Sequence, residues 1–413
     1  MWKLCPYLTQ NVAHILSEFV EEAIEMKKQG ERRRRKGFCR VFRRRDLPAG
    51  QTGGMIQGMN DAKETTEFLL AQCAAYPRLC VADLLKGLHQ SVFGCGHFVT
   101  DAAAEYLREE LAALPAQAGE SVEELDGDFC RIHLRAVQRG ELSEKTLLRL
   151  FRLSAEKTCG SVEQLEERLD VLTELSRAGK LPFSAEEVTA VVENWKQAGF
   201  PACHHSEAFR EAYRPAYRVV AREYVRLLPL LGKIDALLEK QERVIVALEG
   251  GSAAGKTTLA QQLRHIYGCT VFHMDDFFLR PHQRTAERLA EPGGNVDRER
   301  FYEEVLRPLV ENRSVTYRRY DCQCGELLTP VTVEPTRLTV VEGAYSMHPQ
   351  LAGCYDLSAF LRISPQLQRS RILKRNGADM AQRFFNTWIP MEQAYFEAMN
   401  TAQRCDLILE VDE

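Results

Sequence analysis

Apolar residues recur at two different spacings along the chain, and the first spacing is that of a helix. Between residues 59 and 240 they fall three or four positions apart, as Leu165 and Leu169 do, which places them on one face of a helix. Runs of alternating Val and Ile are almost absent from this stretch. The pattern predicts an all-helical domain over residues 59–240, with a last helix that begins at Glu207 and continues towards Lys240.

From residue 241 the apolar positions form short continuous runs, separated by stretches with helical spacing. Residues 244–248 are wholly apolar, as expected of a strand buried on both faces of a parallel sheet. Similar short runs occur at residues 270–273, 338–341, 360–363 and 407–411. Strands that alternate with helices predict an α/β domain over residues 241–413, in which helices cover both faces of a parallel sheet.

A glycine-rich motif lies between the first of these strands and the helix that follows it. The motif GxxxxGK[ST] is formed by Gly250, Gly251, Ser252, Ala253, Ala254, Gly255, Lys256 and Thr257. Glycines let backbone N–H groups turn inward around phosphate oxygens, and the helix N-terminus adds partial positive charge. We therefore expect a P-loop NTPase fold that binds the phosphates of ATP or GTP, with Thr258 also in the site. Lys256 would reach the β- and γ-phosphates, and the Thr257 hydroxyl would bind Mg²⁺.

Two carboxylates lie at the ends of predicted strands. Asp275 comes after the run at residues 270–273, and Glu342 comes after the run at residues 338–341. The carboxyl ends of parallel strands meet at one edge of the sheet, where ligands bind in folds of this kind. At that edge Glu342 can face the phosphates, and Asp275 can accept a proton from an acceptor hydroxyl.

A basic stretch follows the fourth predicted strand. Its cations, on a predicted helix, are Arg369, Arg371, Lys374 and Arg375. Cations in this position can neutralise charge on a transferred phosphoryl group and close the site to water. Arg371 and Arg375 lie one helical turn apart and are the first candidates for this role. For any single one of these residues, a solvated helix face is the alternative interpretation.

Taken in order, these motifs resemble those of the uridine kinase and phosphoribulokinase superfamily. The matching segments are residues 250–257, 274–278, 295–297, 320–321 and 341–343. The resemblance implies phosphoryl transfer from ATP or GTP to a small-molecule hydroxyl, with Asp275 as general base and Mg²⁺ held by Thr257 and Glu342. It also implies that Asp297 binds a ribose diol and that Tyr320 lies beside the nucleoside. A helix N-cap before Arg298 is the other interpretation of Asp297.

One segment departs from the uridine kinase pattern. Uridine kinases carry a histidine a few residues after the Tyr-Asp pair, whereas this chain continues with Cys322, Gln323, Cys324 and Gly325. Recognition of a nucleobase is therefore less well supported than phosphoryl transfer. The pair Cys322 and Cys324 could also bind a metal, but the sequence has no second ligand pair at zinc-site spacing.

The first 58 residues differ in charge from the rest of the chain. They hold 12 Lys/Arg against 6 Asp/Glu, although the whole chain has a net charge of -4. A nucleic-acid-binding arm and a solvated leader are two interpretations. Our preferred hypothesis is that residues 1–58 form a basic leader without a role in the core, or lie outside the functional protein, whose globular pattern begins after Met59.

Composition narrows the class of protein. Hydrophobic residues make up 45% and charged residues 27% of the chain, as in a globular protein. No apolar run is long enough to span a membrane, and the N-terminus has no uncharged signal-peptide core. Thirteen scattered cysteines favour reduced thiols in a cytoplasmic protein.

Two functions follow from these observations. The first is an ATP-dependent kinase of a small polyhydroxylated metabolite, with uridine or another nucleoside as the first candidate, and without nucleic-acid or membrane partners. The alternative is a regulatory P-loop NTPase or nucleotide switch, in which the helical domain is the effector. Residues 204–206, 213–215 and 217–218, together with 90–97, could line a pocket in the helical domain, whose role the sequence leaves open.

Overall fold

The computed structural model describes residues 53–95, 102–116, 118–157 and 160–412, with only the backbone of residues 53–61. The predicted basic leader therefore lies outside the described residues, apart from the backbone of residues 53–58. The chain divides into two compact units, one ending at Ala236 and the other beginning at Leu237. The two units are described separately below.

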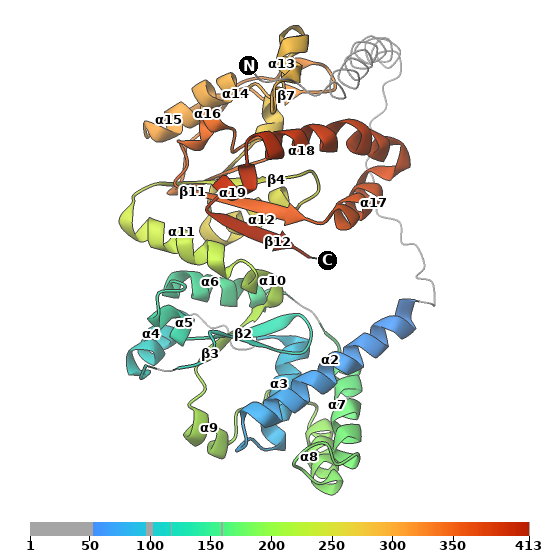
Figure 1. Cartoon of the computed structure of the whole chain (residues 1–413). Helices are drawn as coiled ribbons and strands as arrows, with labels where there is room; N and C mark the ends of the chain where they lie inside the picture. The colour runs from blue at the N-terminus through green and yellow to red at the C-terminus, as the bar shows by residue number, and fades with distance from the viewer. Residues whose placement is uncertain (1–52, 96–101, 117, 158–159, 413) are drawn as a thin grey trace. The chain divides into compact units, whose positions relative to one another are not determined.

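The N-terminal unit is mainly helical, as its sequence predicts (Figure 1). The longer helices are α2 (Gly53–Ala75), α3 (Val81–Phe93), α4 (Ala103–Ala113), α6 (Glu144–Ala155), α7 (Val162–Arg177) and α8 (Ala185–Gln197). The shorter ones are α5 (Arg135–Gln138), α9 (Glu207–Tyr213) and α10 (Arg222–Val225), before α11 (Leu228–Lys240) at the boundary. Buried leucines at helical spacing, such as Leu165, Leu169 and Leu172 on α7, form its core.

The prediction that this unit is all-helical is wrong in one respect. It contains an antiparallel sheet of β1 (Val122–Glu124), β2 (Phe129–His133) and β3 (Tyr217–Ala221), in the order β1-β2-β3. Strand β2 is buried at every position although it contains Arg131 and His133. Such short strands with buried polar residues lack the alternation that identifies a half-buried strand in a sequence.

The predicted helix from Glu207 to Lys240 is also wrong. Helix α9 ends at Tyr213, and Arg214 adopts a left-handed conformation with φ of 45°. Pro215 follows, and a proline disfavours the helical conformation in the residue before it. The chain then forms strand β3 before the helices α10 and α11.

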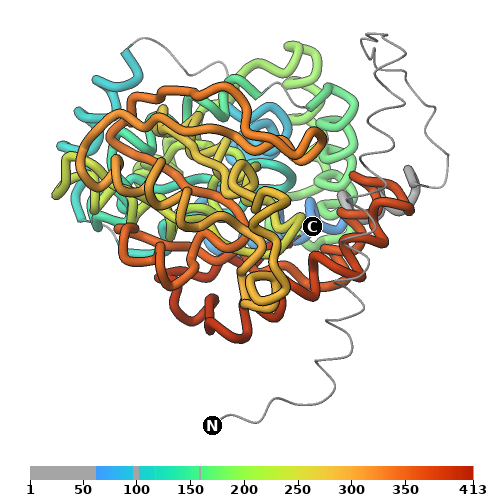
Figure 2. The backbone as a smooth tube through the Cα atoms, turned by 90° about the horizontal axis from the view of Figure 1, so that it is seen from above, coloured from blue at the N-terminus to red at the C-terminus, as the bar shows by residue number. Residues whose placement is uncertain are grey.

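The C-terminal unit contains the predicted parallel sheet. Its five strands are β4 (Val244–Gly250), β5 (Thr270–His273), β10 (Leu338–Glu342), β11 (Leu357–Ile363) and β12 (Leu407–Val411). They lie in the order β12-β11-β4-β10-β5 and are all parallel. The α/β prediction is therefore confirmed, and each of these strands overlaps one of the predicted apolar runs. The path of this part of the chain, from yellow to red, can be followed in Figure 2.

The remaining elements of this unit lie around the sheet. They are α12 (Lys256–Tyr267), η2 (Met274–Phe277), η3 (Pro281–Gln283), α13 (Ala286–Ala290), α14 (Arg298–Phe301), η4 (Tyr302–Leu306), α15 (Arg307–Val310), α16 (Pro349–Ala352), α17 (Pro365–Arg383), η5 (Phe384–Trp388), α18 (Ile389–Ala398) and α19 (Thr401–Arg404). Two small antiparallel pairs join β6 (Val315–Tyr317) to β9 (Val331–Val333) and β7 (Tyr320–Asp321) to β8 (Glu326–Leu327).

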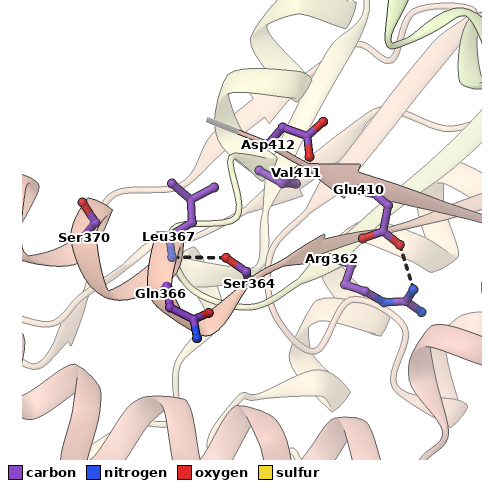
Figure 3. Close-up of a pocket in the computed structure, with 8 residues that line it drawn as sticks. All are labelled: Arg362, Ser364, Gln366, Leu367, Ser370, Glu410, Val411 and Asp412. Atoms are coloured by element: carbon purple, nitrogen blue, oxygen red, sulfur yellow. Dashed lines mark hydrogen bonds and ion pairs between the residues drawn. The ribbon is translucent and has the colours of Figure 1, made fainter. Parts of the chain in front are cut away.

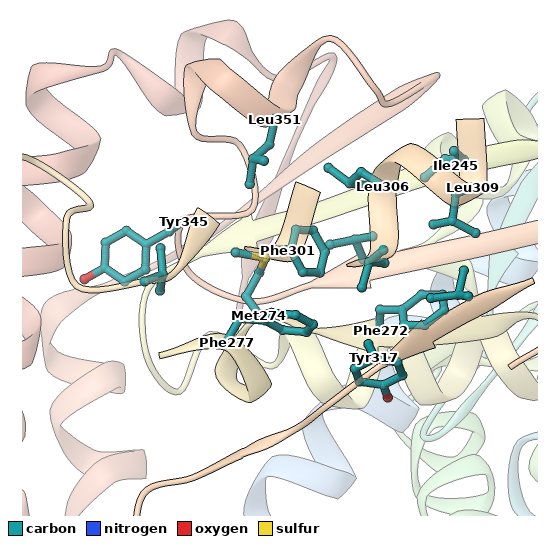
Figure 4. Packing of buried hydrophobic residues seen from close by; sticks show 14 of the residues in the cluster. Ile245, Phe272, Met274, Phe277, Phe301, Leu306, Leu309, Tyr317, Tyr345 and Leu351 are labelled. Atoms are coloured by element: carbon teal, nitrogen blue, oxygen red, sulfur yellow. The ribbon is translucent and has the colours of Figure 1, made fainter. Parts of the chain in front are cut away.

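Buried apolar side chains hold these elements against the sheet. On one face, Ile245, Phe272 and Val341 from three adjacent strands belong to a cluster with Phe301 and Leu306 (Figure 4). Residues at alternate positions of the strands point to the opposite face. Helix α12 packs against β4, β5 and β10.

The carboxyl ends of the strands form the edge at which the predicted site residues lie. Gly250 ends the central strand, and a Cβ atom there would lie 2.6 Å from the Leu361 carbonyl oxygen of the neighbouring strand. At Gly343, just after β10, a Cβ atom would lie 2.6 Å from that of Met274. These two close approaches need glycine and bring the chain segments at this edge together. Among the described residues, no helix has the length and apolarity that crossing a membrane requires.

Candidate active site

The glycine-rich motif forms a loop between strand β4 and helix α12, as the sequence predicts. Ala253 has φ of 61° and Gly255 has φ of 94°, so the backbone turns twice through the left-handed region. Helix α12 then begins at Lys256. Such a loop at a helix N-terminus presents inward-facing N–H groups suited to phosphate oxygens.

The Lys256 side chain lies inside this loop. Its Nζ donates hydrogen bonds to the carbonyl oxygens of Gly250, at 2.8 Å, and Gly251, at 2.9 Å. The residue is only 9% exposed. The amine is therefore held at the mouth of the loop by two groups that it can exchange for phosphate oxygens.

Thr257 and Glu342 meet at the same edge of the sheet. The Thr257 hydroxyl donates to Glu342 Oε1 over 3.0 Å, and His273 Nδ1 lies 2.6 Å from the same oxygen. Hydroxyl and carboxylate oxygens are hard ligands of the kind that Mg²⁺ prefers, and Mg²⁺ usually takes few protein ligands beside water and substrate phosphates. The pair thus fits Mg²⁺ bound together with a nucleotide. Within the described residues, no group of three or more His, Cys, Asp or Glu side chains could hold a metal ion without a substrate.

Asp275 lies on the turn η2 that follows strand β5, and the residue is exposed. Reduced hydration of its carboxyl group raises the pKa of Asp275, and the charge of Glu342 adds to the rise. The charges that oppose this rise are those of Lys256, His273 and Arg375. Asp275 is therefore close enough to the predicted phosphate, metal and lid residues to interact with them electrostatically.

A third carboxylate, which the sequence did not point to, binds the phosphate loop from outside. Glu392 on α18 accepts hydrogen bonds from the Ser252 N–H at 2.8 Å and from the Ser252 hydroxyl at 2.6 Å. Gln368 on α17 donates to the Ser252 carbonyl oxygen at 2.8 Å. Both side chains are buried. Helices α17 and α18 are therefore tied to the loop through Ser252, a contact that spans well over a hundred positions of sequence.

The predicted lid arginines lie on α17. Arg371 donates to the Ala253 carbonyl oxygen at 3.5 Å and to the Asp412 carbonyl oxygen at 2.9 Å. The Arg375 guanidinium lies 5.6 Å from the centre of the Phe384 ring, and that of Arg369 lies over Phe385. Arg371 thus touches the phosphate loop directly, whereas Arg375 reaches the region of Asp275 by its charge.

The predicted acceptor residues are both buried. Asp297 caps helix α14, because its Oδ1 accepts from the Arg300 N–H at 3.2 Å, while its Oδ2 accepts from Gln283 at 2.9 Å. The Tyr320 hydroxyl accepts a hydrogen bond from Arg284 at 3.1 Å. In the free protein, Asp297 therefore makes the contacts that the helix-cap interpretation predicts.

Cys322 and Cys324 lie between β7 and β8, and both are exposed free thiols. Reduced hydration raises the pKa of the Cys322 thiol, and the charge of Asp275 adds to the rise. This part of the hairpin therefore lies on the same side of the unit as the candidate general base.

A pocket of about 490 Å³ opens at the carboxyl ends of β11 and β12 (Figure 3). It is lined by Arg362, Ser364, Gln366, Leu367, Ser370, Glu410, Val411 and Asp412. Ser364 caps the N-terminus of α17 by accepting from the Leu367 N–H, and Arg362 pairs with Glu410 at 2.7 Å. Arg371 joins the pocket to the phosphate loop, since it bonds to both Asp412 and Ala253.

The N-terminal unit brings together some of the polar residues that the sequence singled out. Arg131 is fully buried, and its guanidinium donates to Gln90 Oε1 at 2.7 and 3.0 Å and to Glu123 Oε1 at 2.8 Å. Its guanidinium carbon lies 4.7 Å from the centre of the Tyr217 ring.

His205 belongs to the same network. Its Nδ1 lies 2.9 Å from Asp83 Oδ1, and its Nε2 lies 2.7 Å from the Tyr217 hydroxyl. Burial alone would raise the pKa of Asp83, but the hydrogen bond with His205 and those from Cys80 and Ser206 lower it. Gln90, His205 and Tyr217 therefore converge, whereas His204 is exposed. His97 lies outside the described residues.

The fold and the site together define the class of the C-terminal unit. It is a parallel α/β unit with a P-loop, and carboxylates and arginines lie at the same edge of its sheet. Residues 245–401 match the model of the Phosphoribulokinase / Uridine kinase family. The resemblance predicted from the motifs is confirmed over this part of the chain. The match lies within the C-terminal unit and says nothing about the N-terminal one.

Two of the proteins that this chain resembles are phosphoribulokinases. That of Synechocystis sp. is 25% identical over 179 residues, which cover 41% of this chain and 53% of that protein. The chloroplastic enzyme of Spinacia oleracea is 24% identical over 202 residues, 42% of this chain and 49% of that protein. The chain thus spans about half the length of these relatives. A solved structure described as a possible uridine kinase from Bacillus stearothermophilus aligns over 44% of this chain and 98% of that chain, at 22% identity and a TM-score of 0.33.

Proposed function

We propose that the C-terminal unit transfers the γ-phosphoryl group of ATP or GTP to a hydroxyl group of a small polyhydroxylated metabolite. The observation that carries this proposal is that the Lys256 amine, the Thr257–Glu342 pair and the Asp275 carboxylate gather at one sheet edge. Phosphoryl transfer to a hydroxyl requires these three kinds of group: a cation for the phosphates, ligands for a divalent ion and a base.

In this proposal the phosphate loop binds and orients the nucleotide. Lys256 exchanges its bonds to Gly250 and Gly251 for bonds to β- and γ-phosphate oxygens. Thr257 and Glu342 would hold Mg²⁺, which supplies charge neutralisation at the phosphates when it is bound. His273 competes for Glu342 Oε1 in the free protein, so its bond must lengthen or move when that oxygen takes a metal ligand role.

Asp275 is proposed to take the proton of the acceptor hydroxyl. Its exposure leaves it accessible to a substrate, and its raised pKa makes it a stronger base than an ordinary aspartate once it is ionised. Arg375, which interacts with Asp275 electrostatically, and Arg371, which touches the phosphate loop, are proposed to stabilise charge on the transferred group.

The pocket beyond Arg371 is the proposed place of the nucleotide base. It lies at the carboxyl ends of β11, the neighbour of the strand that carries the phosphate loop, and of β12 beyond it. Its lining offers both donors and acceptors, including the hydroxyl groups of Ser364 and Ser370. Adenine and guanine are both compatible with such a lining, and a comparison of ATP with GTP as phosphoryl donor decides between them.

Asp297 and Tyr320 are proposed to contact the acceptor, and uridine is the first substrate to assay. Asp297 would have to release Gln283 in order to accept hydrogen bonds from a diol, because each of its oxygens is engaged in the free protein. The relatives from Synechocystis sp. and Spinacia oleracea are phosphoribulokinases, so sugar phosphates belong in the same panel of acceptors.

The test is an incubation of the full chain with ATP, Mg²⁺ and single acceptors, followed by identification of the products. A kinase gives ADP together with a phosphorylated acceptor, and the Asp275→Asn variant gives neither at a comparable rate. ADP formation that is the same with and without every acceptor would instead support a nucleotide switch.

A further inference from the structure

Glu249, the residue directly before the phosphate loop, is completely buried. Its Oε1 accepts hydrogen bonds from the backbone N–H groups of Gly250, at 2.8 Å, and Tyr345, at 3.1 Å. Its Oε2 accepts from the Met347 N–H at 2.9 Å and from the Tyr395 hydroxyl at 3.1 Å. Each oxygen therefore has two donors, which matches the acceptor capacity of an ionised carboxylate.

The donors come from three segments that each carry a residue of the candidate site. Gly250 begins the phosphate loop. Tyr345 and Met347 lie in the loop that follows Glu342, and Tyr395 lies one turn after Glu392 on α18. A single buried side chain thus joins the loop, the end of strand β10 and helix α18.

The loop after Glu342 needs such a contact. Tyr345 has φ of 75°, a strained conformation for a non-glycine residue that persists only where its surroundings hold it. The Tyr345 side chain lies at one end of the buried cluster in Figure 4, and its N–H is bound by Glu249. Packing and hydrogen bonding together keep this backbone in place.

Gly250 is held from both sides. Its N–H donates to Glu249, and its carbonyl oxygen accepts from Lys256. If Lys256 turns to a phosphate, as the proposed function requires, the bond to Glu249 is the one of these two that remains. Glu249 then keeps the start of the loop in a fixed position relative to the end of strand β10.

We propose that Glu249 is a positioning residue that fixes the phosphate loop against the end of strand β10. It thereby sets the separation between the Thr257 hydroxyl and the Glu342 carboxylate, the pair proposed to bind Mg²⁺ with the nucleotide. The inference rests on the proposed function only in so far as the loop binds a nucleotide with Mg²⁺. It does not depend on which acceptor is phosphorylated.

The charge state of Glu249 follows from its surroundings. Burial raises the pKa of Glu249 to about 7, while its backbone donors, Lys256 and Tyr395 oppose the rise. The titratable and charged groups that interact with it from the neighbouring elements are Lys256, Tyr345, Tyr355, Tyr395 and Cys405. Protonation turns one acceptor into a donor that faces other donors. The ionised form therefore holds the three segments best, and its population falls as the pH drops through about 7.

The experiment compares Glu249→Gln with the unaltered chain, using a non-hydrolysable ATP analogue and Mg²⁺. The glutamine amide places an NH₂ group against N–H or O–H donors. The phosphate loop, the loop after Glu342 and helix α18 therefore lose the acceptor that they share. Loss of a group that orients metal ligands commonly costs 10- to 100-fold, and we expect the affinity for the Mg²⁺–analogue complex to fall by about that factor. The half-saturating Mg²⁺ concentration should rise with it. Tyr395→Phe removes one of the four donors and should give a smaller change in the same direction.

The pH dependence separates this role from a general loss of stability. In the unaltered chain, affinity for the Mg²⁺–analogue complex should decrease as the pH is lowered through about 7. In Glu249→Gln this step should disappear, while titration of the analogue itself is common to both proteins. Glu397→Gln, an exposed carboxylate on the same helix as Tyr395, is the matched control and should behave as the unaltered chain.

Several outcomes would overturn the inference. A folded Glu249→Gln variant with unaltered affinity, Mg²⁺ requirement and pH profile would do so. If that variant does not fold, unaltered binding by Tyr395→Phe together with a flat pH profile of the natural chain would do so as well. A natural chain that does not bind the Mg²⁺–analogue complex would overturn both proposals. Binding that follows the predictions without phosphorylation of any acceptor would refute only the kinase proposal.

Discussion

Replacement of Lys256 by alanine tests the phosphate loop most sharply. In the free protein its amine makes two hydrogen bonds, 2.8 and 2.9 Å long, to carbonyl oxygens of the loop. Hydrogen bonds that involve a charged group contribute roughly 1.5–3 kcal/mol each. If both are transferred to phosphate oxygens in the transition state, their loss raises the barrier by about 3–6 kcal/mol, or roughly 10²- to 10⁴-fold in rate.

The same substitution should affect folding much less. The Gly251 carbonyl oxygen keeps its bond from the Ala254 N–H, at 3.2 Å, and the outer side of the loop keeps its contacts to Glu392 and Gln368. We expect a loss of about 1–2 kcal/mol in the free energy of unfolding, because one carbonyl group loses its donor.

The assay is ADP formation with an acceptor present, combined with calorimetric titration of ATP and a thermal melt. Lys233→Ala, at an exposed lysine of the N-terminal unit, is the control and should be unchanged in all three. A folded Lys256→Ala variant that retained near-normal turnover would refute the assignment of this loop to phosphoryl transfer.

Five further predictions concern other parts of the chain. Asp275→Asn should reduce turnover strongly but spare ATP affinity. Because the pKa of Asp275 is raised, turnover of the natural chain at saturating nucleotide should decrease as the pH falls. The variant should not show this decrease. Glu342→Gln should raise the Mg²⁺ concentration needed for activity, and equal loss of ATP binding in both variants would contradict their separate roles. Asp297→Ala should abolish the preference for a ribose over a deoxyribose acceptor, and a change in thermal stability alone would leave it as a helix cap. Arg131→Met should lower the free energy of unfolding by about 3–5 kcal/mol in a urea titration, since it removes the buried guanidinium that pairs with the partly buried Glu123 carboxylate. A protein that begins at Met59 should match the full chain in melting temperature and activity, and a marked loss of either would show that residues 1–58 contribute.

The parallel sheet and its phosphate loop could be predicted because their signals are local. A wholly apolar run followed by the glycine-rich motif specifies a strand, a loop and a helix from adjacent residues. The same holds for β5, whose end places Asp275 next to the loop. The three-stranded sheet of the N-terminal unit could not be predicted in this way. Its strands are short, and Arg131 and His133 are buried in it through partners far away in the sequence.

The carboxylates that support the loop were missed for a related reason. Glu249 ends an apolar run and looks like the solvated end of a strand, and only its four donors, two of them from the loop after Glu342, reveal a buried role. Glu392 acts on Ser252 from a helix near the end of the chain. A contact of this separation leaves no pattern in a single sequence.

The central claim is that this chain moves a phosphoryl group to a small-molecule hydroxyl. The most direct measurement is mass spectrometry of the products after incubation of the full chain with ATP, Mg²⁺ and one acceptor at a time, beginning with uridine and including sugar phosphates. We predict one acceptor that gains a single phosphoryl group in equal amount to the ADP formed, and formation of that product roughly 10²- to 10⁴-fold more slowly by Lys256→Ala. ADP formation without phosphorylation of any acceptor would contradict the claim.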